Sequence, residues 1–136
     1  MSDRRELTFS SRIESVEEAA KEAEEFARHV GLGDEFVFAI DMAVRESVAN
    51  AVKHGNRFDK SKPVNVVLEK DAGSFRLQVR DFGEGFDFDH VADPTDPANL
   101  LKANGRGILF MNTFMDEVEW TRPEGGGMAV KMSKKL

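Results

Sequence analysis

The sequence predicts one α+β domain, a two-layer sandwich in which helices cover one face of a mixed, mostly antiparallel sheet. Length is the first observation, because 136 residues can form one domain that buries its own core. Short stretches of alternating apolar and polar residues indicate strands, and longer stretches with helical periodicity indicate helices. The expected order is strand, two helices, two strands, a long loop, a helix and two strands. This order favours a layered domain spanning residues 1–136.

The first expected elements are a strand and an amphipathic helix. Residues 7–13 alternate apolar and polar side chains for most of their length, as a half-buried strand does. Residues 16–30 are rich in Ala and Glu with apolar side chains on one side, which predicts a helix. Ser15 precedes Glu18 by three residues, the spacing of a capping box, and Gly31 is expected to end the helix.

A second helix is expected from Asp34 to Lys53, with Asp34 as its cap and Gly55 as its end. Turn signals and alternating side chains predict the elements that follow. A stretch with two prolines and little periodicity has the length of a functional lid. These later elements are a hairpin of residues 64–68 and 75–79, the lid at 87–104, a helix from residue 105, and a closing hairpin of residues 116–121 and 128–132.

The composition excludes several classes of function. A net charge of -6, from 25 acidic and 19 basic residues, argues against a nucleic acid or an anionic membrane as partner. The chain has no cysteine, so disulfides and thiolate chemistry are excluded. The N-terminus lacks the apolar core of a signal peptide, and no apolar run approaches the roughly 20 residues that cross a bilayer. We therefore expect a cytoplasmic protein.

Three polar residues recur four positions apart on the second expected helix. At this spacing, Glu46, Asn50 and His54 line up along the helix axis beside the apolar stripe. The amide oxygen of Asn50 is a hard ligand that suits Mg²⁺, and the Glu46 carboxylate can orient or deprotonate an attacking hydroxyl. Taken alone, the same residues also fit a solvated helix face, and His54 and Asn56 also fit a helix-ending turn.

Two glycine-containing segments can bring a ligand close to the backbone. Asp81 leads an Asp-Phe-Gly-Glu-Gly-Phe loop, in which Gly83 and Gly85 permit close approach and the aspartate can accept a hydrogen bond from an exocyclic amine. The Gly-Arg-Gly run at 105–107 opens a helix whose free N–H groups can bind an anion, with Arg106 adding charge. Each segment also fits a plain turn or helix entry. Neither has the dinucleotide-binding or Walker-type spacing.

In combination, these segments resemble the N-box, G1-box and G2-box of the GHKL ATPase superfamily, and the chain is similar to its bacterial anti-sigma-factor serine kinases. The motifs are Glu-x-x-x-Asn-Ala-x-x-His-Gly-Asn at the end of the second helix, Asp-x-Gly-x-Gly-Phe, an Asp- and Pro-rich lid and Gly-Arg-Gly-Ile-Leu-Phe-Met. The resemblance covers nearly the whole chain. It implies the ATP-binding sandwich called the Bergerat fold, with ATP and Mg²⁺ as cofactors.

The resemblance also implies a role for each motif residue. Glu46 matches the catalytic base that activates a substrate serine, Asn50 matches the Mg²⁺ ligand, and Asp81 matches the residue that binds the adenine amine. The Gly-Arg-Gly run matches the loop that wraps the phosphates. The other expected nucleotide-binding residues are His54, Gly83, Gly85, Phe86, Gly105, Arg106, Gly107 and Ile108.

By this resemblance, we expect an ATP-dependent serine/threonine protein kinase, a transferase that acts in transcription regulation. It would phosphorylate a STAS-type anti-anti-sigma protein, sequester a sigma factor and form a homodimer. Two other hypotheses remain open: an ATP-gated protein-binding module without phosphoryl transfer, and a scaffold that binds no nucleotide. The sequence departs from the family at one position, since Met128 follows Gly127 where relatives often carry a Gly-Thr pair whose hydroxyl supports adenine recognition.

Overall fold

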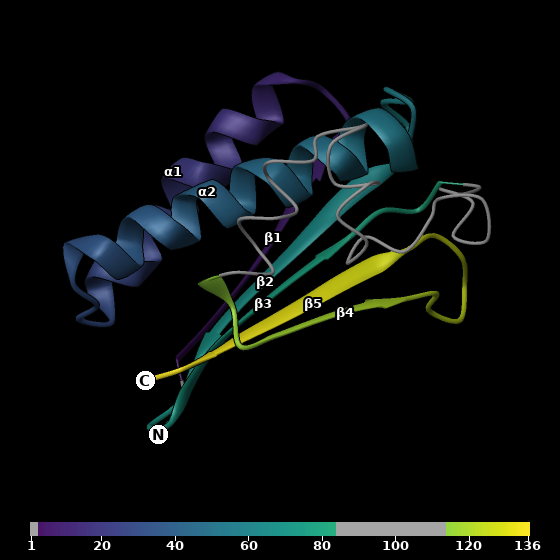
Figure 1. The fold of residues 1–136 in the computed structure, drawn as a ribbon. Coiled ribbons are helices and arrows are strands. Elements are labelled where there is room, and N and C mark those ends of the chain that lie inside the picture. The colour runs from purple at the N-terminus through teal and green to yellow at the C-terminus, as the bar shows by residue number, and fades with distance from the viewer. Residues whose placement is uncertain (1–2, 84–113) are drawn as a thin grey trace, which may run out of the picture.

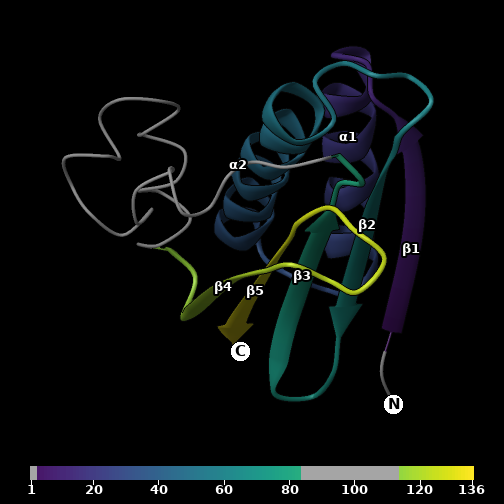
Figure 2. The same ribbon diagram turned by 90° about the vertical axis from the view of Figure 1, so that its right-hand side faces the viewer.

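A computed structural model of the chain describes residues 3–83 and 114–136. In this part of the chain, a five-stranded sheet is covered on one face by two helices (Figures 1 and 2). The strand order is β1-β2-β3-β5-β4, so β1 and β4 form the two edges. The elements are β1 Asp3–Ser10, α1 Glu14–His29, α2 Asp34–Asn50, the π-helical turn η1 Ala51–Gly55, β2 Pro63–Lys70, β3 Ser74–Arg80, β4 Glu117–Thr121 and β5 Ala129–Lys135.

The predicted two-layer α+β sandwich is confirmed, and the sheet is more regular than expected. Each neighbouring pair of described strands is antiparallel, so the parallel pairing that a mixed sheet allows is not found among them. The β2–β3 and β4–β5 hairpins both form where the alternating side chains predict them. On β2 and β3, every second residue is buried against the helices, which is the pattern of a sheet with one covered face.

The start of α1 differs from the capping-box prediction. The helix begins at Glu14, and Ser15 lies inside its first turn with its side chain fully buried. Its hydroxyl donates to the carbonyl of Ser10 at 2.7 Å, so it ties the helix to the end of β1 instead of capping it. The C-terminal end is as predicted, because Gly31 takes a φ of +85° and the N–H of Leu32 bonds back to the carbonyl of Ala27 at 3.0 Å.

The second helix changes its hydrogen bonding near its end. Gly33, and not Asp34, occupies the position before the helix, and no side chain caps it. After Asn50 the chain continues as the π-helical turn η1, which ends at Gly55 as the sequence predicts. In this wider turn the N–H of Asn56 bonds to the carbonyl of Ala51 at 2.8 Å.

Apolar side chains from both helices meet the covered face of the sheet. Phe75 lies at the centre of this core, where its ring is 5.8 Å from that of Phe36 and 6.1 Å from that of Phe26. These rings meet edge to face or at a tilt, the geometries that aromatic pairs prefer. The largest fully buried side chains are Phe75, Ile40, Leu68, Leu77, Val37, Val44, Val48, Val52, Val64, Val66 and Asn56. Asn56 is the polar member of this set.

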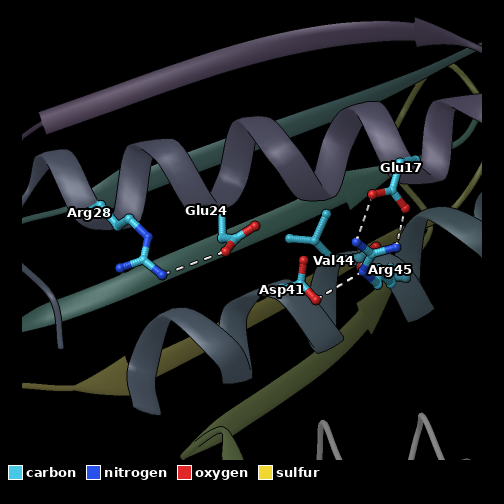
Figure 3. A network of polar contacts seen from close by, with 7 residues as sticks. Glu17, Glu24, Arg28, Asp41, Val44 and Arg45 are labelled. Carbon is cyan, nitrogen blue, oxygen red and sulfur yellow. Dashed lines mark hydrogen bonds and ion pairs between the residues drawn. The ribbon is translucent and has the colours of Figure 1, made fainter. Parts of the chain in front are cut away.

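A polar network joins the outer sides of the two helices (Figure 3). Arg45 of α2 reaches across to Glu17 of α1, with Nη2 3.1 Å from Oε1, and also bonds Asp41 at 2.9 Å. The hydrogen bond and charge of Arg45 lower the pKa of Glu17 below its ordinary value. This network links the two helices on the side away from the sheet. No helix in the described residues is long and apolar enough to cross a membrane.

Candidate functional site

The end of α2 carries the polar residues that the sequence singles out. Asn50 is 6% exposed, Glu46 is half-buried one turn earlier, and His54 is exposed on η1. The three residues therefore differ in burial, and His54 lies on the π-helical turn that follows Asn50. Glu46 and Asn50 keep the one-turn spacing that places them on a common side of α2.

The environment of Glu46 is unusual for a carboxylate on a helix. Its Oε1 atom is buried and has no hydrogen-bond partner among the described residues. Burial raises the pKa of Glu46 above its ordinary value, and the positive charge of Lys53 only partly offsets this effect. A buried carboxylate oxygen without a donor is costly, so such groups deserve a functional explanation.

Asp81 lies directly after β3 and is 6% exposed. Its Oδ1 accepts hydrogen bonds from the N–H of Gly83 at 3.1 Å and of Met128 at 3.3 Å, while its own N–H donates to the Met128 carbonyl at 2.9 Å. Burial raises the pKa of Asp81 and outweighs these two backbone hydrogen bonds. Within the described part of the chain no donor reaches Oδ2, which leaves one carboxylate oxygen for a ligand.

Three glycines let the backbone close around Asp81. A Cβ atom on Gly55 would lie 2.2 Å from Asp81 Oδ2, and one on Gly83 would lie 1.8 Å from the Gly55 carbonyl oxygen. Gly127 has a φ of +79°, and a Cβ there would lie 1.9 Å from the Asp81 carbonyl oxygen. A side chain at any of the three would collide with the backbone or with the carboxylate. The close approach therefore requires glycine.

The β4–β5 turn is held against this region by Arg80. Its Nη2 atom donates to the carbonyls of Glu124 and Gly126 at 3.2 and 3.0 Å. Its guanidinium also lies 4.4 Å from the centre of the Phe82 ring. The end of β3, the Asp81 loop and the turn before β5 thus form one connected unit.

A small cavity joins the end of α2 to this unit. Its volume is about 10 Å³, which is roughly the space of one water molecule. Ligand pockets are commonly about 300–1,000 Å³, so these walls can hold only the edge of a ligand without moving. The cavity is lined by Ser47, Asn50, Ala51, Val79, Asp81, Trp120, Met128 and Val130. Asn50 and Asp81, predicted from separate motifs, therefore share one cavity.

Several predicted residues fall outside this description. The expected lid at 87–104 and six predicted nucleotide-binding residues lie outside the described residues. The six are Gly85, Phe86, Gly105, Arg106, Gly107 and Ile108. Conversely, the structure gives importance to four residues that were not among the predicted site residues: Gly55 and Asn56, which close the first motif, and Gly127 and Met128, which mark the departure from the family. For Gly127 and Met128, the Gly-Gly-Gly-Met run before β5 is the sequence feature that could have indicated this importance.

The donor groups present suit a cation that keeps most of its own water. In residues 3–83 and 114–136, no cluster of three or more His, Asp or Glu side chains could hold a metal ion by itself. Mg²⁺ needs only one or two protein ligands when it also binds waters and substrate phosphates. The carboxamide of Asn50, which lines the cavity, offers a hard oxygen ligand of this kind. Asn50 therefore has the chemistry of one of the few protein ligands that Mg²⁺ needs.

Comparison with known proteins identifies the class to which this fold and site belong. Residues 9–134 match the histidine kinase-like ATPase domain, and the chain belongs to this family. The expected membership of the GHKL ATPases is thereby confirmed, and the family implies nucleotide binding.

Among individual proteins, the chain resembles anti-sigma-factor kinases. It is 25% identical to the serine-protein kinase RsbW of Oceanobacillus iheyensis over 116 residues, covering 81% of this chain and 72% of that protein. It is 31% identical to the serine-protein kinase RsbW of Bacillus subtilis over 103 residues, covering 71% and 63%. It is 33% identical to the anti-sigma F factor of Bacillus thuringiensis over 101 residues, covering 71% and 68%. The alignments thus span about two thirds of each relative's length.

Proposed function

We propose that this protein is an ATP-dependent serine/threonine kinase of the anti-sigma type. The observation that carries the proposal is that Asn50 and Asp81 line one cavity, with the half-buried Glu46 one helical turn away. A base-recognising carboxylate, a hard amide ligand and a carboxylate of raised pKa are the groups that transfer from ATP to a hydroxyl would use. The names of the relatives, serine-protein kinase and anti-sigma factor, support the same reaction.

In the proposed reaction, the oxygen of a substrate serine forms a bond to the γ-phosphorus of ATP. The bond between that phosphorus and the β–γ bridging oxygen breaks, and ADP leaves with the bonding electrons. Glu46 orients the attacking hydroxyl and accepts its proton, a role suited to a carboxylate whose pKa burial raises above its ordinary value. Most of the rate enhancement in phosphoryl transfer comes from positioning and charge stabilisation, so the orienting role is the larger one.

The nucleotide would be held by groups from two parts of the chain. Asp81 would accept a hydrogen bond from the adenine amine through the oxygen that no described donor reaches. Asn50 would hold Mg²⁺, which neutralises phosphate charge when bound. For the other expected nucleotide-binding residues, the proposal rests on their motifs alone. These residues are His54, Gly85, Phe86, Gly105, Arg106, Gly107 and Ile108.

We further propose a STAS-type anti-anti-sigma protein as the phosphorylated partner and a sigma factor as the sequestered one. The chain as a whole would act as one ATP-binding kinase domain in the cytoplasm and would form a homodimer. The resemblance to RsbW and to anti-sigma F factor supports these partners. Light scattering of the purified protein tests the dimer, because a monomeric mass at micromolar concentration would contradict it.

The proposed reaction is tested by incubating the protein with Mg-ATP and a STAS-domain protein encoded beside its gene. We expect stoichiometric ADP and a phosphoserine in the STAS protein, located by mass spectrometry. Nucleotide binding without transfer to any such partner would contradict the kinase and favour an ATP-gated binding module. A thermal melt unchanged by Mg-ATP would contradict both, because a ligand at about 100 times its Kd adds about 2.7 kcal/mol of stability.

A further inference from the structure

The side chain of Asn56 connects the end of η1 to three other segments of the chain. Asn56 is 2% exposed and follows the π-helical turn η1. Its Nδ2 atom donates to Ser11 Oγ at 2.7 Å, to the Pro63 carbonyl at 2.9 Å and to the Lys62 carbonyl at 3.1 Å. Its Oδ1 atom accepts from the N–H of Phe82 at 2.9 Å. One buried amide thus connects the β1–α1 junction, the start of β2 and the loop that carries Asp81.

The hydrogen bond to Phe82 fixes the peptide group that follows Asp81. The N–H side of this peptide is held by Asn56, and its carbonyl oxygen packs against Gly127. On the other side of the Asp81 Cα, the backbone pairs with Met128. The direction in which the Asp81 side chain leaves the backbone is therefore set by Met128 on one side and by Asn56 on the other.

The chemistry of an asparagine is needed at this position. The amide supplies an acceptor for one backbone N–H and two hydrogens for a group of three oxygens. An aspartate would keep the acceptor but would place a charge against two carbonyl oxygens. An alanine would leave the Phe82 N–H without its acceptor. Ser11 is less demanding, because without its hydroxyl the Nδ2 hydrogens still have the Lys62 and Pro63 carbonyls.

We propose that Asn56 is a positioning residue for base recognition, which holds the Asp81 carboxylate where it can select a purine that carries an exocyclic amine. The inference rests on the proposed function, in which Asp81 accepts a hydrogen bond from adenine. It goes further by assigning the selectivity to a residue outside the cavity lining. Asn56 acts through the Phe82 N–H and does not itself touch the nucleotide.

The test compares the Kd of ATP with that of inosine triphosphate, which carries an oxygen in place of the amine. A hydrogen bond to a charged acceptor corresponds to a preference of about tenfold or more for ATP in the unaltered protein. In Asn56→Ala and in the milder Asn56→Ser, we expect the preference to fall to about threefold or less. The matched control Ser11→Ala keeps the Phe82 hydrogen bond and should keep the full preference.

A merely structural role of Asn56 would change both Kd values equally or would lower only the melting temperature. A folded Asn56 variant that retains the full preference for ATP would therefore overturn the inference while leaving the proposed role of Asp81 intact. Equal binding of the two nucleotides by the unaltered protein would overturn both. Amide hydrogen exchange of the unaltered protein provides a test without substitutions: ATP should slow exchange at Phe82 more than inosine triphosphate does. Equal protection would contradict the proposal.

Discussion

The backbone of Met128 pairs with Asp81 in both directions. The N–H of Asp81 donates to the Met128 carbonyl at 2.9 Å, and the N–H of Met128 donates to Asp81 Oδ1 at 3.3 Å. The Met128 side chain, 5% exposed, lines the same cavity as Asp81. The residue at this position thus orients Asp81 through its backbone, whatever its side chain. A threonine at position 128 would keep both of these backbone hydrogen bonds and would add a hydroxyl.

Met128→Thr tests the contribution of that missing hydroxyl. One added neutral hydrogen bond should tighten ATP binding by about two- to tenfold, measured by calorimetry. The loss of a buried thioether should also lower the free energy of unfolding by about 2 kcal/mol. Met132→Thr is the matched control, because Met132 is equally buried on β5 but does not line the cavity. The control should lose similar stability without tighter binding, and a similar gain in both variants would contradict the account.

Gly55→Ala tests the close approach to Asp81. The new Cβ would lie 2.2 Å from Asp81 Oδ2, so the carboxylate or the turn must move. We expect ATP affinity to fall about tenfold or more and the free energy of unfolding to fall by about 1–3 kcal/mol. Gly73→Ala is the control, because its Cβ would meet nothing closer than 3.9 Å. Unchanged ATP affinity in a folded Gly55→Ala protein would show that Asp81 does not recognise the nucleotide.

The raised pKa of Glu46 predicts how stability depends on pH. In the window between the ordinary glutamate pKa and the raised folded value, the folded protein holds a proton that the unfolded chain has released. The free energy of unfolding therefore falls as pH increases through this window. Glu46→Gln should remove the part of this pH dependence that comes from Glu46. The free energy of unfolding of the variant, relative to that of the unaltered protein, should therefore be higher at neutral pH than at pH 4. Denaturant unfolding at several pH values measures the difference.

Glu17→Gln should show the opposite sign and serves as the comparison. Arg45 lowers the pKa of Glu17, so this interaction stabilises the folded state above the ordinary glutamate pKa and is lost as pH falls. The loss of stability in Glu17→Gln, compared with the unaltered protein, should therefore be larger at neutral pH than at acid pH. A pH dependence of the same sign in both variants would contradict the assigned environments.

The helix-joining network in Figure 3 should contribute little to stability. Arg45 and Asp41 are one helical turn apart, with side chains 37% and 16% exposed. A double-mutant cycle with alanine at both positions should give a coupling free energy of about 0.5 kcal/mol. The coupling of Arg45 to the more exposed Glu17 should be weaker and more sensitive to salt. A coupling several times larger between Arg45 and Asp41 would show that this network is a main support of the helix pair.

The sequence predicted the elements whose residues alternate or repeat locally. The β2–β3 hairpin was predicted from apolar residues at every second position, and these residues are buried in the structure. Helices α1 and α2 were predicted from their apolar stripes. The N-terminal strand was predicted to start at Leu7 but starts at Asp3. Its first residues are charged, and in the strand register Asp3 lies opposite Lys70 and Arg4 opposite Glu69 of β2. Alternation of apolar residues does not detect pairing of this kind.

The parts of the site that depend on distant contacts could not be predicted. Asn56 resembles a local turn residue, but its partner Phe82 is 26 residues away and Ser11 is 45 residues away. The π-helical turn forms where Gly55 packs against Gly83, a contact that no local propensity encodes. Glu46, Asn50 and Asp81 could be singled out because each stands in a motif with its own chemistry. The cavity that Asn50 and Asp81 share follows from the fold.

We propose that Glu46 serves phosphoryl transfer and not nucleotide binding. Two measurements on Glu46→Gln test this role: the rate of single-turnover transfer from Mg-ATP to the STAS partner, and the Kd for ATP. We predict a Kd within about twofold of the unaltered protein and a transfer rate lower by about 10²-fold or more, the usual contribution of a positioned acid or base. Transfer at the unaltered rate by Glu46→Gln would contradict the account.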